Sequence, residues 1–182
     1  MSERYELTRP VFLIGFMGAG KTSVARRVAR DAGIASVDLD TYLERREGRR
    51  IKDIFAEDGE EGFRAIETDV LEELAAKDDP LLVSCGGGIV TQARNCAILA
   101  ERGLVVHLRV DADEAASRIS DMSSRPLFQD IEAARRRCAE RLPQYEAVAD
   151  LTIDTAGKSI AVTAGKVFHA LKERGVLCQR PE

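Results

Sequence analysis

The sequence has few of the features that mark a secreted or membrane-bound protein. Only four of its 182 residues are cysteine. They follow neither a CxxC pattern nor a metal-ligand spacing, so we expect reduced thiols. No apolar run approaches the ~18 residues that a membrane-spanning helix needs. These absences predict a cytoplasmic protein with no membrane partner.

An excess of basic residues is also missing. The 27 lysines and arginines are outnumbered by 31 aspartates and glutamates, which leaves a net charge of −4. This balance argues against nucleic acid as the main partner. An acidic protein that binds a polyanion must gather its basic groups locally, and one short stretch does so with Arg118, Arg125, Arg135, Arg136, Arg137 and Arg141.

No internal repeat, low-complexity segment or interdomain linker is present, and residues 1–182 suit one compact domain. Apolar runs alternate with amphipathic stretches, which predicts a parallel β-sheet covered by helices, the α/β class. The run Leu104–Val110 is almost continuously apolar, as a strand buried on both faces should be. The expected strands are Val11–Ile14, Ala35–Val37, Leu81–Cys85, Leu104–Val110 and Leu151–Ile153.

Between these strands, amphipathic periodicity and glycine stop signals predict the helices. The expected helices are Thr22–Asp31, Thr41–Glu47, Ile51–Asp58, Glu60–Lys77, one from Asp111 through Ser120, and Ser159–Arg174 before a short polar tail. The stretch Asp121–Asp130 lacks periodicity. It could be a mobile loop that closes over a ligand or an ordinary surface connection.

The most informative segment is Gly15–Thr22, which reads Gly-Phe-Met-Gly-Ala-Gly-Lys-Thr and fits the pattern G-x-x-x-x-G-K-[S/T]. It follows a predicted strand and precedes a predicted helix, which is the context that a phosphate-binding loop requires. Such a loop cradles phosphates with backbone N–H groups and a helix N-terminus. We therefore expect a nucleoside triphosphate to contact Gly18, Ala19, Gly20, Lys21, Thr22 and Ser23, with the Thr22 hydroxyl as a ligand of Mg²⁺.

Several classes of phosphate-loop protein can be set aside. Guanine-specific switches carry Asn-Lys-x-Asp, but the single asparagine, Asn95, precedes Cys96. Motor ATPases place a magnesium-binding acid after a second core strand. Asp111 could be that acid, but it precedes a predicted helix and is better interpreted as its N-cap. A small-molecule kinase fits best.

Two aspartates, Asp38 and Asp40, follow the second predicted strand, at the sheet edge where ligands of open α/β sheets bind. One could support hydrated Mg²⁺ while the other accepts a hydrogen bond from the attacking hydroxyl. A helix cap plus a solvated acid is the alternative. Gly86–Gly88, after another strand, could form a tight turn or a ligand-contacting backbone. Arg64 and Glu67 share a helix face and could form either a positioned guanidinium or a surface ion pair.

Taken in order, these segments resemble the shikimate kinase family from about Val11 to Leu171. The motifs that carry the resemblance are Gly15–Thr22, Asp38-Leu39-Asp40, Gly48–Ile51 with Ile54-Phe55, Asp58-Gly59-Glu60, Phe63-Arg64 with Glu67, Gly86–Gly88, Arg125-Pro126-Leu127, and Arg141 before Pro143 and Tyr145. The resemblance implies a three-layer phosphate-loop fold with a five-stranded parallel sheet, a substrate-binding helical segment at about 40–70 and a lid at about 121–130. It also implies a monomer that transfers the γ-phosphate of ATP to the 3-hydroxyl of shikimate in chorismate biosynthesis.

The family's residue roles transfer position by position. Asp40 matches the aspartate at the reacting hydroxyl, Asp38 the aspartate that supports Mg²⁺, and Arg125 the lid arginine at the phosphates. Arg118 matches an arginine that packs on adenine. The residues expected to bind shikimate are Asp40, Arg64, Gly86, Gly87, Gly88 and Arg141, with apolar walls from Ile51, Phe55 and Phe63.

Two other functions remain open from the sequence. A gluconate kinase would also phosphorylate a hydroxylated acid, but that family lacks this combination of motifs. A nucleotide-binding regulatory protein without catalysis should have lost Lys21, Thr22, Asp40 or Arg64, and all four are present.

Overall fold

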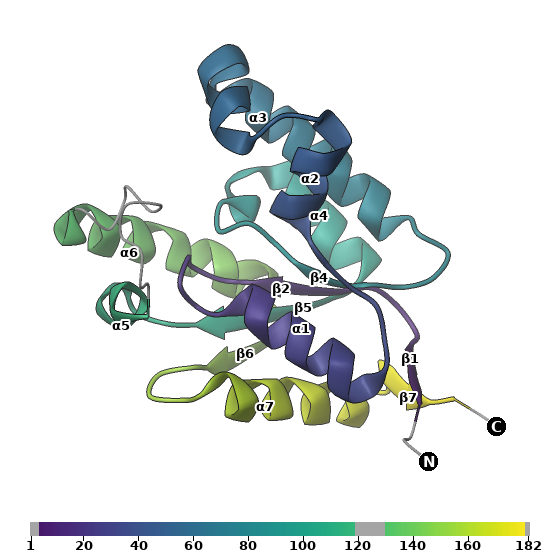
Figure 1. Ribbon diagram of the computed structural model, residues 1–182. Helices are drawn as coiled ribbons and strands as arrows, with labels where there is room; N and C mark the ends of the chain where they lie inside the picture. The colour runs from purple at the N-terminus through teal and green to yellow at the C-terminus, as the bar shows by residue number, and fades with distance from the viewer. Residues whose placement is uncertain (1–3, 119–129, 181–182) are drawn as a thin grey trace.

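The computed structural model describes residues 4–118 and 130–180. Figure 1 shows how the helices and strands of these residues are arranged. The elements are β1 (Tyr5–Leu7), β2 (Val11–Ile14), α1 (Lys21–Ala32), β3 (Ser36–Asp38), α2 (Leu39–Glu47), α3 (Ile51–Ala75), β4 (Leu82–Ser84), the short 3₁₀ helix η1 (Ile89–Thr91), α4 (Ala93–Arg102), β5 (Leu104–Arg109), α5 (Ala112–Ser117), α6 (Ile131–Val148), β6 (Leu151–Asp154), α7 (Ile160–Glu173) and β7 (Leu177–Gln179).

A five-stranded parallel sheet in the order β3-β4-β2-β5-β6 forms the centre of the molecule. This confirms the predicted fold class, and each predicted strand overlaps one strand of the sheet. The central strand β2 is fully buried along its whole length, because helices cover both faces of a parallel sheet. In Figure 1, α1 and α7 lie along one face, while α4 and α6 cover the other.

The helix ends follow the glycine signals. Helix α1 ends at Gly33 and α2 at Gly48, both with left-handed backbone. Gly59, with φ 71° and ψ −175°, interrupts α3 where the sequence predicted two separate helices. Asp111 caps α5 by accepting a hydrogen bond from the Glu114 N–H, so the cap interpretation of Asp111 was right.

Other expectations need correction. The helix predicted to run through Ser120 ends at Ser117, with Arg118 as its C-cap. The prediction that only a short polar tail follows α7 is wrong, because strand β7 follows this helix and pairs antiparallel with β1. These strands have three residues each, too few for a periodicity to be recognised. The lid expected at about 121–130 lies outside the described residues except for Asp130, which caps α6.

Within the described ranges, no helix combines the length and apolarity needed to cross a membrane. Because the strands of the sheet are parallel, their carboxyl ends all lie at the same edge. The loops after β2, β3, β4 and β6 meet there, and this edge carries the site described next.

Candidate active site

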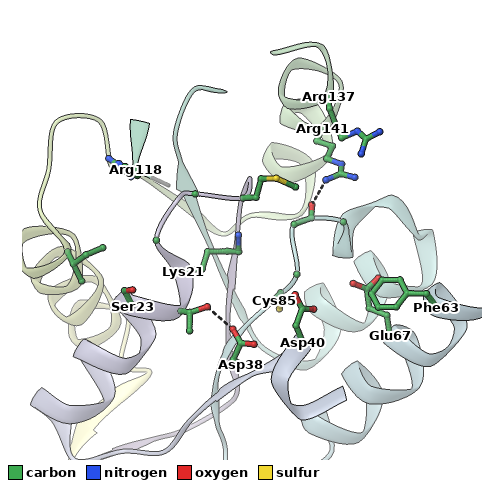
Figure 2. Close-up of a pocket in the computed structure, with 18 of the residues that line it drawn as sticks. Lys21, Ser23, Asp38, Asp40, Phe63, Glu67, Cys85, Arg118, Arg137 and Arg141 are labelled. Carbon is green, nitrogen blue, oxygen red and sulfur yellow. Dashed lines mark hydrogen bonds between the residues drawn. The ribbon is translucent and has the colours of Figure 1, made fainter. Parts of the chain in front are cut away.

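A cavity of about 870 Å³ opens at the carboxyl edge of the sheet (Figure 2). Its lining comes from the loop after β2, the start of α2, helix α3, the glycines after β4, Arg118 after α5, helix α6 and the start of α7. Most predicted site residues line it: Gly18, Gly20, Lys21, Thr22, Ser23, Asp38, Asp40, Phe55, Phe63, Arg64, Gly86, Gly87, Gly88, Arg118 and Arg141.

The loop between β2 and α1 forms one wall. Its last residue before the helix, Gly20, has φ 87° and ψ 16°, a left-handed conformation that glycine adopts without steric cost. Lys21 is buried and donates hydrogen bonds to the carbonyl oxygens of Gly15 (2.8 Å) and Phe16 (3.0 Å). These bonds hold the ammonium group within the loop, beside the N-terminus of α1, where an anion is favoured.

Thr22 and Asp38 form the floor beside this loop. The Thr22 hydroxyl donates to Asp38 Oδ2 at 2.6 Å and lies 3.1 Å from the Ser84 hydroxyl. The other oxygen of Asp38 caps α2, accepting from the N–H (2.9 Å) and the hydroxyl (3.0 Å) of Thr41. Burial would raise the pKa of Asp38, but the hydrogen bonds from Thr22 and Thr41 outweigh it and lower the pKa. Asp38 is therefore a helix cap and a cavity carboxylate at once.

Asp40 lies between the two ends of the cavity. Figure 2 shows it to the right of Lys21 and Asp38, with Glu67 and Phe63 farther to the right. A Cβ atom on Gly86 would lie 3.0 Å from Asp40 Oδ1 and 3.2 Å from Glu67 Oε1. The two carboxylates thus converge on the same backbone turn. That turn is tight, because Ile89 N donates to Gly86 O at 3.1 Å.

Arg64 and Glu67 form an ion pair at the far end, with 2.7 Å between Nη1 and Oε2. The side chains are only 11% and 1% exposed, so the surface ion pair considered from the sequence is wrong. The guanidinium lies over the Phe63 ring, which stacks on Phe55. Burial raises the pKa of Glu67, while Arg64 opposes this by its charge and hydrogen bond.

Gly87 meets helix α6 at the top of the cavity. Its carbonyl oxygen accepts from Arg141 Nη1 at 3.3 Å and from the buried Tyr145 hydroxyl. The Tyr145 ring stacks on His107 of β5 with 5.1 Å between centroids. Burial raises the pKa of Tyr145 to about 12, so its hydroxyl stays a donor at neutral pH. Gly86–Gly88 is accordingly both a tight turn and a cavity wall, and the two sequence interpretations are compatible.

The opposite end of the cavity lies between α5 and α7. Arg118 Nη1 donates to the Thr155 hydroxyl at 3.0 Å, and Nη2 donates to the Thr155 carbonyl and to Glu114 Oε1, both at 2.5 Å. Glu114 also accepts from Gly157 N at 2.8 Å. These bonds fix the loop after β6. Lys158 of this loop and Ile160 at the start of α7 complete this end of the lining.

Three predicted residues differ from the rest. Ala19 and Ile51 do not line the cavity. Ala19 is buried, and Ile51 begins α3, where its N–H donates to Glu44 Oε1 at 2.9 Å. Arg125 lies outside the described residues. The sequence reasoning did not list Met17, Glu67 and Cys85 among the site residues, although they lie in or beside its motifs, and it missed Arg137, Lys158, Ser159 and Ile160. Two sequence signals could have identified these last four residues. Arg137 precedes Arg141 by one helical turn, so both side chains should share a helix face. Lys158, Ser159 and Ile160 follow a strand of the parallel sheet, where ligands of such sheets bind.

Comparison with known proteins links this architecture to one family. The family model described as "Shikimate kinase" matches residues 17–172. A shikimate kinase of Moorella thermoacetica is 42% identical over 167 residues, covering 89% of this chain and 94% of the relative. A solved shikimate kinase from Acinetobacter baumannii, in complex with shikimate, has a TM-score of 0.84 at 37% identity and covers 91% of this chain and 94% of its own. A gluconokinase from Sinorhizobium meliloti, at a TM-score of 0.56 and 19% identity, covers 93% of this chain and 98% of its own and shares the fold alone.

Proposed function

This chain belongs to the shikimate kinase family, and from that premise we propose that its cavity transfers the γ-phosphate of ATP to the 3-hydroxyl of shikimate, giving shikimate 3-phosphate and ADP. The observation that carries the proposal is the position of Asp40. It lies between a phosphate-binding loop on one side and the buried Arg64–Glu67 pair on the other. A carboxylate in that position can bridge a nucleotide and an acid that carries hydroxyl groups.

The loop residues 18–23 would hold the ATP phosphates. The first residues of α1 line the cavity, so the N-terminus of this helix would favour an anion there, and Lys21 supplies a point charge at the same place. Phosphoryl transfer depends mainly on positioning and charge stabilisation. Lys21 would move from the Gly15 and Phe16 carbonyls to the phosphates, a short displacement for a flexible side chain that already lies in the loop.

The donor set beside the loop fits magnesium. Thr22 and Asp38 offer a hydroxyl and a carboxylate 2.6 Å apart, both hard oxygen ligands. Within the described part of the chain, no cluster of three or more histidine, cysteine or acidic side chains could hold a metal alone. This agrees with an ion that takes its remaining ligands from phosphate and water. A bound magnesium ion would neutralise phosphate charge, and the residues that would hold it are Thr22 and Asp38.

The far end of the cavity suits a carboxylate with neighbouring hydroxyls. Arg64 and Arg141 offer planar guanidinium groups that can bind a carboxylate through two parallel hydrogen bonds. Arg64 Nε is a buried donor that has no hydrogen-bond partner within residues 4–118 and 130–180, so the Glu67 ion pair does not use the full donor capacity of the group. Gly86–Gly88 and Asp40 would contact the hydroxyls, and Asp40 would accept the proton of the attacking one. Phe55 and Phe63 would pack on the carbon ring.

The remaining roles are proposed from the family alone. They include Arg125 at the phosphates, Arg118 beside adenine, a lid at about 121–130, a monomeric state and a cytoplasmic location. The Arg118 role is compatible with its position, since it lines the nucleotide end opposite Ile160.

The experiment that tests this function measures ADP release from MgATP with shikimate, with gluconate and without an acceptor. We expect turnover confined to shikimate. Turnover with gluconate would favour the other acid-phosphorylating kinase, and nucleotide binding without turnover for either acid would favour a non-catalytic protein.

A further inference from the structure

Arg137 is a cation of the cavity to which the proposed reaction assigns no role. Arg137 lies on α6 four residues before Arg141, and side chains at this spacing share one helix face. Figure 2 shows both guanidinium groups projecting toward the side of the cavity that holds Phe63 and Glu67, away from Lys21. Arg137 therefore belongs to the acceptor end and not to the nucleotide end.

Arg137 also connects the cavity to an outer recess. This recess, of about 340 Å³, adjoins the cavity through shared lining residues. The shared residues are Phe55, Arg64, Arg137 and Arg141, and the recess adds Glu60, Thr91, Glu140 and Gln144. A small molecule that reaches Arg64 and Arg141 from this side would pass Arg137.

The other cavity arginines are held by protein groups. Arg64 pairs with Glu67, Arg118 with Glu114, and Arg141 donates to the Gly87 carbonyl. For Arg137, by contrast, neither a hydrogen bond nor an ion pair to the described residues is seen, and its side chain is exposed. Glu60 and Glu140 line the same recess, but neither forms an ion pair with Arg137.

We propose that Arg137 is a substrate-capture residue that attracts the substrate carboxylate at the mouth of the cavity and passes it to Arg64 and Arg141. This inference rests on the proposed function. Because Arg137 is exposed, it acts through charge and not through a buried bidentate contact. It should increase capture of an anionic acceptor and leave the chemical step unchanged.

The neighbouring Arg136 provides a matched control. It lies on the same helix, is exposed, carries the same charge and does not line the cavity or the recess. Arg137→Gln and Arg136→Gln therefore change the net charge equally. The first removes a charge from the lining of the cavity, and the second removes a charge outside it. Arg137→Lys keeps the positive charge but loses the planar guanidinium that can bind a carboxylate through two parallel hydrogen bonds.

The test measures kcat and KM for shikimate and for ATP at ionic strengths of about 0.01 M and about 1 M, where charges are screened over about 30 Å and about 3 Å. We expect Arg137→Gln to lower kcat/KM for shikimate roughly two- to fivefold at low salt, as an exposed ion pair would. The difference should largely disappear at high salt, with kcat and KM for ATP unchanged. Arg136→Gln and Arg137→Lys should behave like the wild type.

Equal behaviour of Arg137→Gln and Arg136→Gln would overturn the proposal, as would an effect confined to kcat or to KM for ATP. A loss in Arg137→Lys as large as that in Arg137→Gln would overturn the charge mechanism. None of these outcomes touches the proposed function as long as the wild type phosphorylates shikimate, so the two failures are distinguishable.

Discussion

Replacing Gly88 by alanine should displace Arg64 without disturbing the backbone. A Cβ atom at Gly88 would lie 2.7 Å from Arg64 Cζ and closer still to both terminal nitrogens. These atoms belong to the end of a flexible side chain, so the guanidinium should move while the main chain stays in place. Gly88 has φ −95° and ψ 4°, which alanine also adopts. Within the protein, the substitution therefore acts on Arg64 first.

The size of the effect follows from the bonds that Arg64 would make. An ordinary carbon–nitrogen contact needs about 3.5 Å, so the group must retreat by roughly 1 Å, enough to break a charge-assisted hydrogen bond. Each such bond contributes about 1.5–3 kcal/mol. Since about 1.4 kcal/mol equals a factor of ten, we expect KM for shikimate to rise about 10- to 150-fold, with KM for ATP unchanged.

A double-mutant cycle provides the assay and its control. Steady-state ADP release is measured for the wild type, Gly88→Ala, Arg64→Ala and the double variant. Gly88→Ala should change kcat/KM for shikimate little once Arg64 is absent, because its effect acts through that side chain. The same loss from Gly88→Ala in both backgrounds would refute the reasoning, because the turn itself would then be responsible.

Two further predictions concern Asp40 and His107. Asp40→Asn should leave ATP binding largely intact and reduce kcat by orders of magnitude, as measured by nucleotide titration and ADP release; wild-type turnover would remove Asp40 from the mechanism. Burial, helped by the charges of Arg109 and Lys21, lowers the pKa of His107 to about 4 from its usual 6.5. The unfolded chain then binds more protons between these values, so the free energy of unfolding should fall by up to about 3 kcal/mol as pH drops through this window. Urea denaturation of His107→Gln should show a shallower fall, and an equal fall in both proteins would contradict the assignment.

The phosphate loop could be predicted from sequence because each fixed position has a local physical cause. Glycine is needed where the backbone is left-handed, as at Gly20, and Lys21 and Thr22 are set by their place at the start of α1. No tertiary information is required for these positions. The same holds for the Asp38 cap, which depends on residues three apart in the chain.

The remaining features depend on contacts between distant segments. The pairing of β1 with β7 joins the two ends of the described chain, and no local pattern encodes it. Ile51 was expected in the substrate wall, yet its N–H bond to Glu44 fixes it as a helix start outside the cavity. Gly88 has a conformation open to any residue, and only the position of Arg64 explains why glycine is needed there.

The arginine cluster shows how the fold selects among similar residues. Arg135 forms surface ion pairs with Asp113 and Glu132, and Arg136 does not line the cavity, whereas Arg137 and Arg141 do. One helical turn separates the two that face inward, so periodicity decides which charges reach the ligand. The chain carries a net charge of −4, yet the basic side chains that line its cavity outnumber the acidic ones, namely Lys21, Arg64, Arg118, Arg137, Arg141 and Lys158 against Asp38, Asp40 and Glu67. A positive cleft in a negative protein concentrates anionic ligands at one place. The exposed Arg137 can therefore increase the capture of an anionic substrate although it forms no hydrogen bond or ion pair with the described residues.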